Sequence, residues 1–497
     1  MNTVQVGHCR PEHLKKTGKL WRACEKPRFK GTKAMETTEN SNVHIDLSQK
    51  KTTRRQFLKN SCSGITVAST VAAGFPYIAT SHAASDLPIR IGVVGCGGRG
   101  TGAVLDALQA ATEVIYPMDT YHTEDAAEGA RAAARGVQIV ALADVFQDRL
   151  ERCRQQLQKV GMPVSKDRCF IGFYAYEKVM NLPDVNYVIL ATPPNFRPAH
   201  LRAAVEAGKH AFVEKPVAVD ATGVRSVIES GEIARKKSLA IGAGTMRRRE
   251  NGSCETTRHV QEGMIGDIIA CEAIWSGGEL WSVKRQPSWT DMEDQLRNWL
   301  YYTWLSGDFI VEQFVHNLDV INWVLGEHPV RAFAMGGRQV RTDSRFGNIY
   351  DHFSVEYQYA SGVRCFAMDR QTKGCANRVE EVFLGTKGMA RFGLFRGWGI
   401  NLKSGKQWRF SGPRNNPYHQ EHQDLINSIR SGRPINEARQ LAESTLTAIM
   451  GREATYSGQS IEWEDAMNST QNLRPPTYEF GPLPVREVPM PGKYKFS

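Results

Sequence analysis

Several features that define particular protein classes are missing from this sequence. Its ten cysteines include no C-x-x-C pair, and seven of them are scattered beyond residue 90. This spacing indicates neither a zinc site nor a disulfide scaffold. We therefore expect isolated buried thiols and no metal centre.

An excess of positive charge is lacking over most of the chain. The net charge is +11, but residues 1–60 alone carry 14 Lys and Arg against 5 Asp and Glu. The rest of the chain has 49 basic and 47 acidic residues, so it is nearly neutral. Because a nucleic-acid binder concentrates basic residues on its folded part, we expect no nucleic-acid partner.

The leader, residues 1–86, lacks an apolar run long enough to span a membrane. Arg54 and Arg55 precede Phe57 and Leu58, and an uncharged stretch follows over residues 61–84. That stretch is short, rich in Thr, Ser and Gly, and ends in small residues, as in a secretory signal. The layout resembles a twin-arginine export signal, and a basic disordered tail is the alternative.

The twin-arginine resemblance implies passage through the twin-arginine export machinery and a periplasmic or secreted location. This route carries folded proteins, so a cofactor would be loaded before export. Residues 1–34 look like additional N-terminal sequence, and the choice between Met1 and Met35 as the start stays open.

A glycine-rich turn organises the next part of the chain. Residues 89–94 form a short apolar run that is typical of a parallel strand buried on both faces. Gly95, Gly97 and Gly100 then complete a G-x-G-x-x-G pattern, and residues 101–108 have a helical pattern. This order is typical of dinucleotide-binding folds, in which a pyrophosphate lies at the helix start. A plain glycine-rich turn is the alternative.

Asp144 follows the second predicted strand, residues 137–143. Dinucleotide folds place there the acid that binds the adenosine ribose of NAD. Asp144 lies further from the glycines than usual because residues 117–136 read as a helical insertion or lid. Alternatively, Asp144 caps a helix that begins at Gln147. Further apolar runs alternate with helical patterns, which predicts a doubly wound parallel sheet; the runs are 186–191, 210–213 and 239–242, and the helices 147–160, 198–207 and 221–236.

These motifs together resemble the Gfo/Idh/MocA family, which includes glucose-fructose oxidoreductase and inositol dehydrogenase. The resemblance covers residues 88–463 and includes the glycine turn, the strand that ends at residues 191–194, the helix with His200, and the run Glu214-Lys215-Pro216. In the family the lysine of this run lies beside the nicotinamide and the reacting hydroxyl, which implies that role for Lys215. A surface lysine before a turn is the alternative.

The resemblance also implies a tightly bound NAD, or NADP, held at the carboxyl edge of the sheet. The expected cofactor-binding residues are Gly95, Gly97, Gly98, Arg99, Gly100, Asp144, Thr192, Pro193, Pro194, Asn195, His200, Glu214 and Lys215.

From about residue 245 the pattern changes to strands. Apolar alternation recurs at residues 265–273, 330–335, 353–359, 363–368, 380–384 and 389–392. This predicts a large, mostly antiparallel sheet with helices on one face. The family has such an α+β domain, whose open face covers the nicotinamide and forms oligomer contacts. The resemblance therefore implies a homo-oligomer, either a dimer or a tetramer.

The segment 308–326 holds the second set of catalytic candidates. If it is one helix, one face presents Glu312, His316, Asp319 and Trp323. A carboxylate one turn from a histidine can orient the imidazole and tune its pKa. The family has an Asp, then a His four residues later, so Glu312 departs from it by one methylene. His316 is the candidate acid or base; a buried core histidine and a metal ligand are the alternatives.

Polar residues of the second domain supply substrate candidates. Arg247 can hold an anionic or hydroxyl-rich substrate, and a surface charge is the alternative. Tyr418 and His419 open a helix whose Tyr-x-x-Glu-His run resembles one near the substrate cleft in the family. His419 with His422 also has metal-ligand spacing, but we expect no metal there. The substrate candidates are Arg247, Asp319, Tyr418 and His419.

The patterns together predict an α/β protein with a leader (1–86), a Rossmann domain (87–244), an α+β domain (245–465) and an extended tail (466–497). Residues 470–497 are rich in proline and aromatics, as in a strap over the body or over a partner subunit. We expect an exported NAD(P)-dependent oxidoreductase that acts on a CH–OH group of a sugar or polyol. A redox-neutral NAD-dependent glycosidase and a non-catalytic sugar-binding or scaffold protein are the alternatives.

Overall fold

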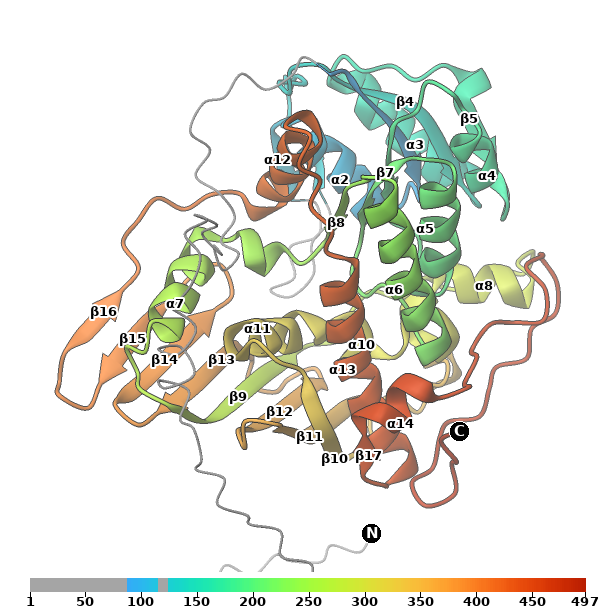
Figure 1. The fold of residues 1–497 in the computed structure, drawn as a ribbon. Helices are drawn as coiled ribbons and strands as arrows, with labels where there is room; N and C mark the ends of the chain where they lie inside the picture. Colours follow the sequence, from blue (N-terminus) through green and yellow to red (C-terminus); the bar gives the residue numbers. More distant parts are fainter. Residues whose placement is uncertain (1–86, 115–123) are drawn as a thin grey trace, which may run out of the picture. The chain divides into compact units, whose positions relative to one another are not determined.

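The computed structural model describes residues 87–114 and 124–497. The leader with its predicted export signal lies outside these residues. Among the described helices, none is both long and apolar enough to cross a membrane. Two large sheets dominate the described chain, one in each half of the sequence (Figure 1).

A six-stranded parallel sheet forms the N-terminal half and confirms the predicted doubly wound fold. Its strands are short apolar runs because helices cover both faces. In spatial order they are β5 (Cys169–Ile171), β4 (Val137–Asp144), β1 (Ile89–Val94), β6 (Tyr187–Leu190), β7 (His210–Val213) and β8 (Ile241–Ala243).

Each face of this sheet has its own apolar core. On one face, Val94 and Leu190 pack with α4 (Ala175–Met180), α5 (Arg197–Glu206) and α6 (Ala221–Lys236). On the other, Val93 and Ile189 pack with α2 (Gly98–Ala107) and α3 (Gln147–Lys159). The second face also receives α12 (Pro417–Arg430), which returns to this half from late in the sequence (Figure 1).

Two local predictions in this half need correction. The first helix begins at Gly98, three residues before the predicted start. The predicted helical insertion is wrong over its described part, residues 124–136. There β3 (Glu124–Ala126) pairs with β2 (Thr112–Val114), and Gly129 and Gly136 have positive φ angles that end any helix.

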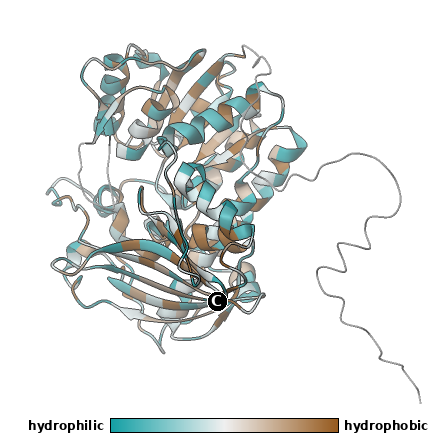
Figure 2. Ribbon diagram, turned by 90° about the vertical axis from the view of Figure 1, so that its left-hand side faces the viewer, coloured by the Kyte–Doolittle hydropathy of each residue, from teal (hydrophilic) through white to brown (hydrophobic). Residues whose placement is uncertain are grey.

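The C-terminal half contains a nine-stranded mixed sheet, antiparallel except where β9 pairs with β12. Strands β11 and β12 alternate between buried and exposed residues, as expected of a sheet covered on one face (Figure 2). In spatial order the strands are β16 (Gln407–Arg409), β15 (Gly399–Leu402), β14 (Gly388–Gly393), β13 (Arg378–Gly385), β9 (Ile268–Gly277), β12 (Arg364–Gln371), β11 (His352–Tyr359), β10 (Pro329–Gly337) and β17 (Ile461–Glu462).

The helices of this half lie on one face of the nine-stranded sheet or at its ends. The long helix α13 (Ala438–Ser457) packs on β10 and β11 and also on α6 of the first half. The remaining helices are α7 (Asn251–Gln261), α8 (Asp291–Arg297), α9 (Thr303–Ser306), α10 (Phe309–Glu312), α11 (Val315–Leu325) and α14 (Trp463–Asn468).

The segment 308–326 is two helices, so the prediction of one continuous helix is wrong. Helix α10 ends at Glu312, and α11 starts at Val315. Between them, the Phe314 N–H donates to the Phe309 carbonyl five residues back, and the His316 N–H donates to the Gln313 carbonyl three residues back. The regular four-residue ladder is lost at this point, which changes how Glu312 and His316 are aimed.

Residues 470–497, here called the strap, run along the body of their own chain without helix or strand (Figure 1). Near its start, the Leu473 N–H donates to Asp220 Oδ2 at 2.8 Å. Near its end, the Tyr350 hydroxyl donates to the Pro489 carbonyl at 2.7 Å. The expectation of a strap over the body is confirmed for the described chain.

Candidate active site

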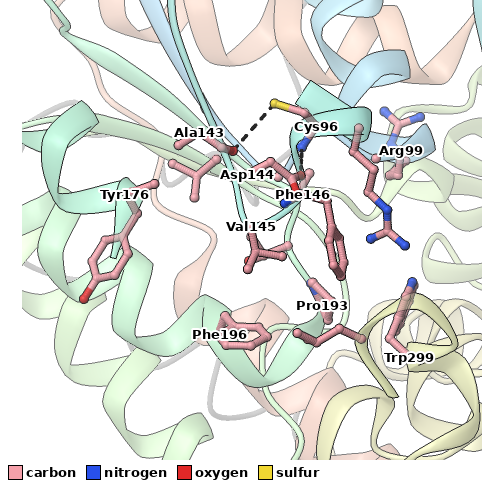
Figure 3. A pocket seen from close by; sticks show the side chains of 18 of the residues that line it. Cys96, Arg99, Ala143, Asp144, Val145, Phe146, Tyr176, Pro193, Phe196 and Trp299 are labelled. Carbon is pink, nitrogen blue, oxygen red and sulfur yellow. Dashed lines mark hydrogen bonds between the residues drawn. The ribbon is translucent and has the colours of Figure 1, made fainter. Parts of the chain in front are cut away.

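A cavity of about 340 Å³ lies at the carboxyl edge of the six-stranded sheet. We call it the first cavity. Residues after β1, β4, β5 and β6 line it, as the carboxyl ends of parallel strands meet at one edge. Figure 3 shows Tyr176 at one end of this cavity, and Arg99 and Trp299 at the other.

The glycine turn forms one wall and fits a pyrophosphate. A Cβ added at Gly97 would meet no atom within 4 Å, so this backbone faces open space. A Cβ at Gly100 would lie 1.8 Å from the Gly95 carbonyl oxygen, so only glycine permits the close packing of helix and turn. Gly98 begins α2, whose first N–H groups have no partner within the helix and can bind phosphate oxygens.

Asp144 lines the first cavity and also braces the glycine turn. Its Oδ2 accepts from the Cys96 N–H at 2.6 Å, and its Oδ1 accepts from the Phe146 N–H at 2.8 Å (Figure 3 shows the first bond). Burial raises the pKa of this carboxyl. The alternative of a helix cap is wrong, because the residue that precedes α3 is Phe146 and no side chain caps it. The ribose-binding role stays a prediction.

The loop after β6 contributes only part of the residues predicted from sequence. Thr192, Pro193 and His200 line the first cavity, but Pro194 and Asn195 line neither of the cavities described here. Asn195 instead accepts a hydrogen bond from the strap, where the Tyr478 hydroxyl donates to its Oδ1 at 2.7 Å.

His200 is a neutral wall residue of the first cavity. It shares a hydrogen bond with Thr192 Oγ1 at 3.2 Å and lies against the Tyr176 ring, with centroids 4.3 Å apart. Burial lowers the pKa of its imidazole to about 3.

The C-terminal half covers the first cavity with a segment that the sequence did not single out. Trp281 precedes α8, Leu296 lies on α8, and Trp299 begins the 3₁₀ helix (Trp299–Tyr301) that follows it. We call residues 281–301 the cover. Arg297 ties it to the first half, since its guanidinium pairs with Asp148 at 3.0 Å and lies 4.0 Å from the Phe146 ring centre.

A second cavity of about 120 Å³ adjoins the first, and both are lined by Arg99, Ala191 and Trp299. It contains the residues predicted to be catalytic. The Lys215 ammonium donates to Glu312 Oε1 at 3.0 Å and to the Glu312 carbonyl oxygen at 2.6 Å. Glu312 therefore holds Lys215, and among the described residues it has no hydrogen bond to His316, contrary to the predicted role.

His316 lines the second cavity together with Lys215, and its ring stacks near Trp275 with centroids 6.1 Å apart. Burial lowers the pKa of His316 well below its ordinary value, and the positive charges of Lys215, Arg247 and Arg99 lower it further. The imidazole is therefore neutral at pH 7 and can accept a proton.

An ion-pair chain connects the glycine turn to the Glu214-Lys215-Pro216 run. Arg99 pairs with Glu214 Oε1 at 2.7 Å and with Asp106 Oδ2 at 3.0 Å, and its guanidinium lies 4.7 Å from the Tyr418 ring centre. Tyr418 lines the second cavity, as a substrate candidate should.

The other substrate candidates lie elsewhere. Arg247 is fully buried in a pair with Glu381, at 2.9 Å, so the prediction that it binds substrate is wrong. Asp319 is also buried, where Arg248 pairs with it at 2.9 Å, and it lines neither cavity. His419 lies 3.5 Å from Asp106 and lines neither cavity.

Among the residues of the second cavity that sequence reasoning missed, Arg197 and Gln313 are polar. Arg197 donates to the carbonyl oxygens of Thr192, Glu214 and Pro216, so it clamps the backbone on both sides of Lys215. Burial lowers its pKa to about 10, and it stays charged at pH 7. Arg197 lies in sequence between Thr192 and His200, which were both predicted to bind the cofactor, and this position could have indicated a role at the site.

Gln313 has an amide whose orientation is set by a chain of hydrogen bonds. Arg341 donates to Gln371 Oε1, and Gln371 Nε2 donates to Gln313 Oε1 at 2.6 Å. Because a guanidinium can only donate, the polarity of both amides follows from Arg341. Gln313 therefore turns its oxygen toward Gln371 and its N–H groups away from it.

Within the described residues, no group of three His, Cys, Asp or Glu side chains is placed to hold a metal ion. The two adjoining cavities thus combine a dinucleotide cradle with a lysine, a neutral histidine and a carboxylate, which is the arrangement of a nucleotide-dependent oxidoreductase class.

Family models place the chain in that class. One described as "Oxidoreductase family, NAD-binding Rossmann fold" matches residues 89–245, and one described as "GFO/IDH/MocA C-terminal domain" matches residues 255–391. Together they cover more than half of the sequence. The chain belongs to the Gfo/Idh/MocA family, as its motifs predicted.

The chain resembles several curated relatives over part of its length. It is 26% identical to inositol 2-dehydrogenase 3 of Saccharopolyspora erythraea, over 56% of this chain and 65% of that one. It is 25% identical to the 2,7-anhydro-N-acetylneuraminate hydratase of Escherichia coli, over 41% of this chain and 50% of that one. A glycosyl hydrolase family 109 protein of Streptomyces coelicolor is 26% identical over 36% of this chain and 32% of that one. The chain thus spans no more than two thirds of each relative.

Solved structures share the fold at low sequence identity. The aldose-aldose oxidoreductase of Caulobacter crescentus has a TM-score of 0.57 and 17% identity, over 76% of this chain and 99% of that one. The scyllo-inositol dehydrogenase of Lactobacillus casei, with bound NAD(H) and scyllo-inositol, has a TM-score of 0.54 and 18% identity, with the same shares covered.

Proposed function

We propose that this protein is an exported NAD(P)-dependent oxidoreductase that acts on a CH–OH group of a sugar or polyol. One observation carries the proposal: Lys215 and the neutral His316 line one small cavity that opens beside the glycine turn. When bound, the nicotinamide would accept or donate a hydride at the substrate carbon. The inositol dehydrogenase relative supports the substrate class.

The residues of the second cavity would bind the substrate oxygen, transfer its proton and hold Lys215 in place. Lys215 donates two hydrogen bonds to Glu312, and its third N–H can donate to the reacting oxygen of the substrate. His316 can take the hydroxyl proton in the oxidation direction, because its neutral form dominates. Glu312 and Arg197 keep the Lys215 ammonium and backbone in place.

Two further parts of the proposal concern the cofactor and the compartment. Asp144 at the end of β4 favours NAD over NADP. The first cavity is lined by residues from both halves of the chain, which supports tight binding, and the twin-arginine pattern in the leader supports export of the loaded protein to the periplasm or beyond.

We also propose a homo-oligomer, a dimer or a tetramer, formed through the open face of the nine-stranded sheet. Phe333, Met335, Phe366 and Met368 share that face and are 41–66% exposed. Exposed apolar patches of this kind mark association surfaces. Light scattering should report an oligomer for the wild-type protein and a smaller mass for Met335→Glu; a wild-type monomer would refute this part.

The released cofactor tests the function first. The purified full chain is denatured, and any NAD or NADP in the supernatant is identified by mass spectrometry. The loaded protein is then mixed with a panel that contains scyllo-inositol, myo-inositol and glucose. We expect reduced cofactor to form with at least one compound, and a protein that binds neither nucleotide would refute the proposal.

A second candidate is a redox-neutral NAD-dependent glycosidase, favoured by the glycosyl hydrolase family 109 relative. The two are separated by the products. A dehydrogenase leaves stoichiometric reduced nicotinamide and an oxidised sugar, whereas a glycosidase cleaves a member of a chromogenic glycoside panel with no net change in nicotinamide absorbance.

A further inference from the structure

The middle of the strap contacts the residues that form the wall of the first cavity. The Phe480 ring lies 5.2 Å from the Phe173 ring and 5.9 Å from the Phe146 ring, measured between centroids. Phe146 and Phe173 both line the first cavity. These two rings therefore lie between the cavity and Phe480.

Tyr478 makes a second contact with the wall of the first cavity. Its hydroxyl donates to Asn195 Oδ1 at 2.7 Å, and its ring lies 5.1 Å from the ring of Phe196, which also lines the cavity. A partly buried hydrogen bond and a ring contact together orient the loop after β6.

The same stretch of the strap holds the cover. The Met292 N–H donates to the Gly481 carbonyl at 3.1 Å, and the Leu483 N–H donates to Asp291 Oδ2 at 3.1 Å. Gln295 Nε2 donates to the Leu483 carbonyl at 2.6 Å. Helix α8 of the cover is thus bonded to the strap at three places.

One apolar cluster joins all three parts. It contains Phe146 of the wall and Leu296 of the cover as buried members, and Trp299, Tyr478 and Leu483 pack against it. Because residues of the wall and of the cover both line the first cavity, a dinucleotide bound there would contact both. The middle of the strap contacts both, so it can fix how they lie against that dinucleotide.

We propose that the strap is part of the cofactor site: Tyr478 and Phe480 position the wall and cover of the first cavity and set how long a dinucleotide stays bound. The proposal rests on the proposed function, because it assumes a nucleotide in this cavity. Phe146 follows β4 and Phe173 follows β5, whereas Lys215 follows β7. In the sheet, β5 and β4 are the two strands that lie farthest from β7. Phe480 therefore contacts the end of the first cavity that lies away from Lys215, where the adenosine would bind if Asp144 holds the ribose.

The test measures release of NADH from the full chain, or of NADPH if that is the form the purified protein carries. Loaded protein is mixed with excess oxidised nucleotide, and loss of energy transfer from tryptophan to the reduced nicotinamide gives the dissociation rate. We expect Phe480→Ala to release the cofactor about tenfold faster and Tyr478→Phe about threefold faster. Met490→Ala, an exposed residue of the same strap, is the matched control and should match the wild type.

Two further measurements distinguish a role of the strap in positioning the cavity wall from a general loss of protein stability. The melting temperature of each cofactor-free variant should stay near that of the wild type, because the ends of the strap remain anchored. At saturating cofactor, kcat should change less than twofold. Tyr478→Phe keeps the test decisive if Phe480→Ala fails to fold.

Equal release rates for the wild type, Tyr478→Phe and Phe480→Ala would overturn the proposal, as would an equal acceleration in Met490→Ala. A wild-type protein that binds no reduced nucleotide would instead refute the proposed function. The two failures are therefore distinguishable.

Discussion

The two cavities differ in the kinds of groups that line them. The first is formed by bare backbone at the glycine turn and by rings from both halves of the chain, such as Phe146 and Trp299. The second brings together charged side chains from distant parts of the chain, and one ion pair in it joins Lys215 to Glu312, 97 residues apart. We therefore expect cofactor binding to depend on shape and backbone, and reactivity to depend on long-range ion pairs.

The largest effect is expected from a substitution that removes the lysine cation of the second cavity and leaves the first cavity intact. Lys215→Met should lower kcat/KM by about 10²- to 10⁴-fold, because no N–H group then holds the reacting oxygen. Its affinity for NADH should stay within about threefold of the wild type, measured by fluorescence titration. Lys236→Met, exposed on α6, is the control. Unchanged turnover in Lys215→Met would contradict the assignment.

The converse change damages the first cavity alone. In Gly100→Ala the new Cβ would lie 1.8 Å from the Gly95 carbonyl oxygen, so helix and turn must move apart. We expect a loss of NADH affinity of about 10- to 100-fold. In Gly102→Ala the Cβ meets its nearest atom, Arg99 Nη1, at 3.4 Å, so this variant should bind normally. Equal affinities for the two variants would rule out a tight glycine turn as the binding element.

A smaller effect is expected from the amide chain behind Gln313. In Gln371→Glu both carboxylate oxygens can only accept, so Gln313 must turn its N–H groups toward residue 371 and its oxygen away. We expect kcat/KM to fall about tenfold with NADH affinity unchanged. Gln407→Glu on the exposed edge strand β16 is the control. A wild-type kcat/KM in Gln371→Glu would show that the orientation of this amide does not matter.

The smallest effect is a shift of pH dependence. A histidine with an ordinary pKa near 6.5 is only about one quarter neutral at pH 6. The pKa of His316 is lowered, so its neutral form persists as the pH falls through that range. The oxidation rate at pH 6 should therefore stay within about twofold of that at pH 7.5, once the chemical equilibrium is accounted for. An acid limb centred near pH 6.5 would contradict a lowered pKa.

The parts that could be predicted from sequence are those with local causes. Strand β1 and the glycine turn are continuous in sequence, and Asp144 directly ends the apolar run of β4, so local order indicated where each would lie. The alternation along β11 and β12 likewise predicted a sheet with one covered face. The family resemblance added Lys215 and His316, and both line the second cavity.

The parts that could not be predicted depend on partners far away in the sequence. Arg247 looked like a substrate ligand, but its partner Glu381 lies 134 residues later and buries it. Glu312 was assigned to His316 because a continuous helix was assumed, and the break after α10 directs its carboxylate to Lys215 instead. The strap itself was expected from its composition, but the cover has no motif, and the contacts of the strap with the cover and with Phe146 and Phe173 arise only from packing.

Isotope transfer tests most directly whether the two cavities form one oxidoreductase site. NAD-loaded protein is mixed with glucose or an inositol that carries deuterium on its carbon atoms, and the cofactor is then released and weighed by mass spectrometry. The proposed site predicts deuterium in the nicotinamide of the wild-type protein and none for Lys215→Met. A cofactor that stays free of deuterium across the whole panel, in a protein that binds it, would contradict an oxidoreductase acting on CH–OH groups of these sugars and polyols.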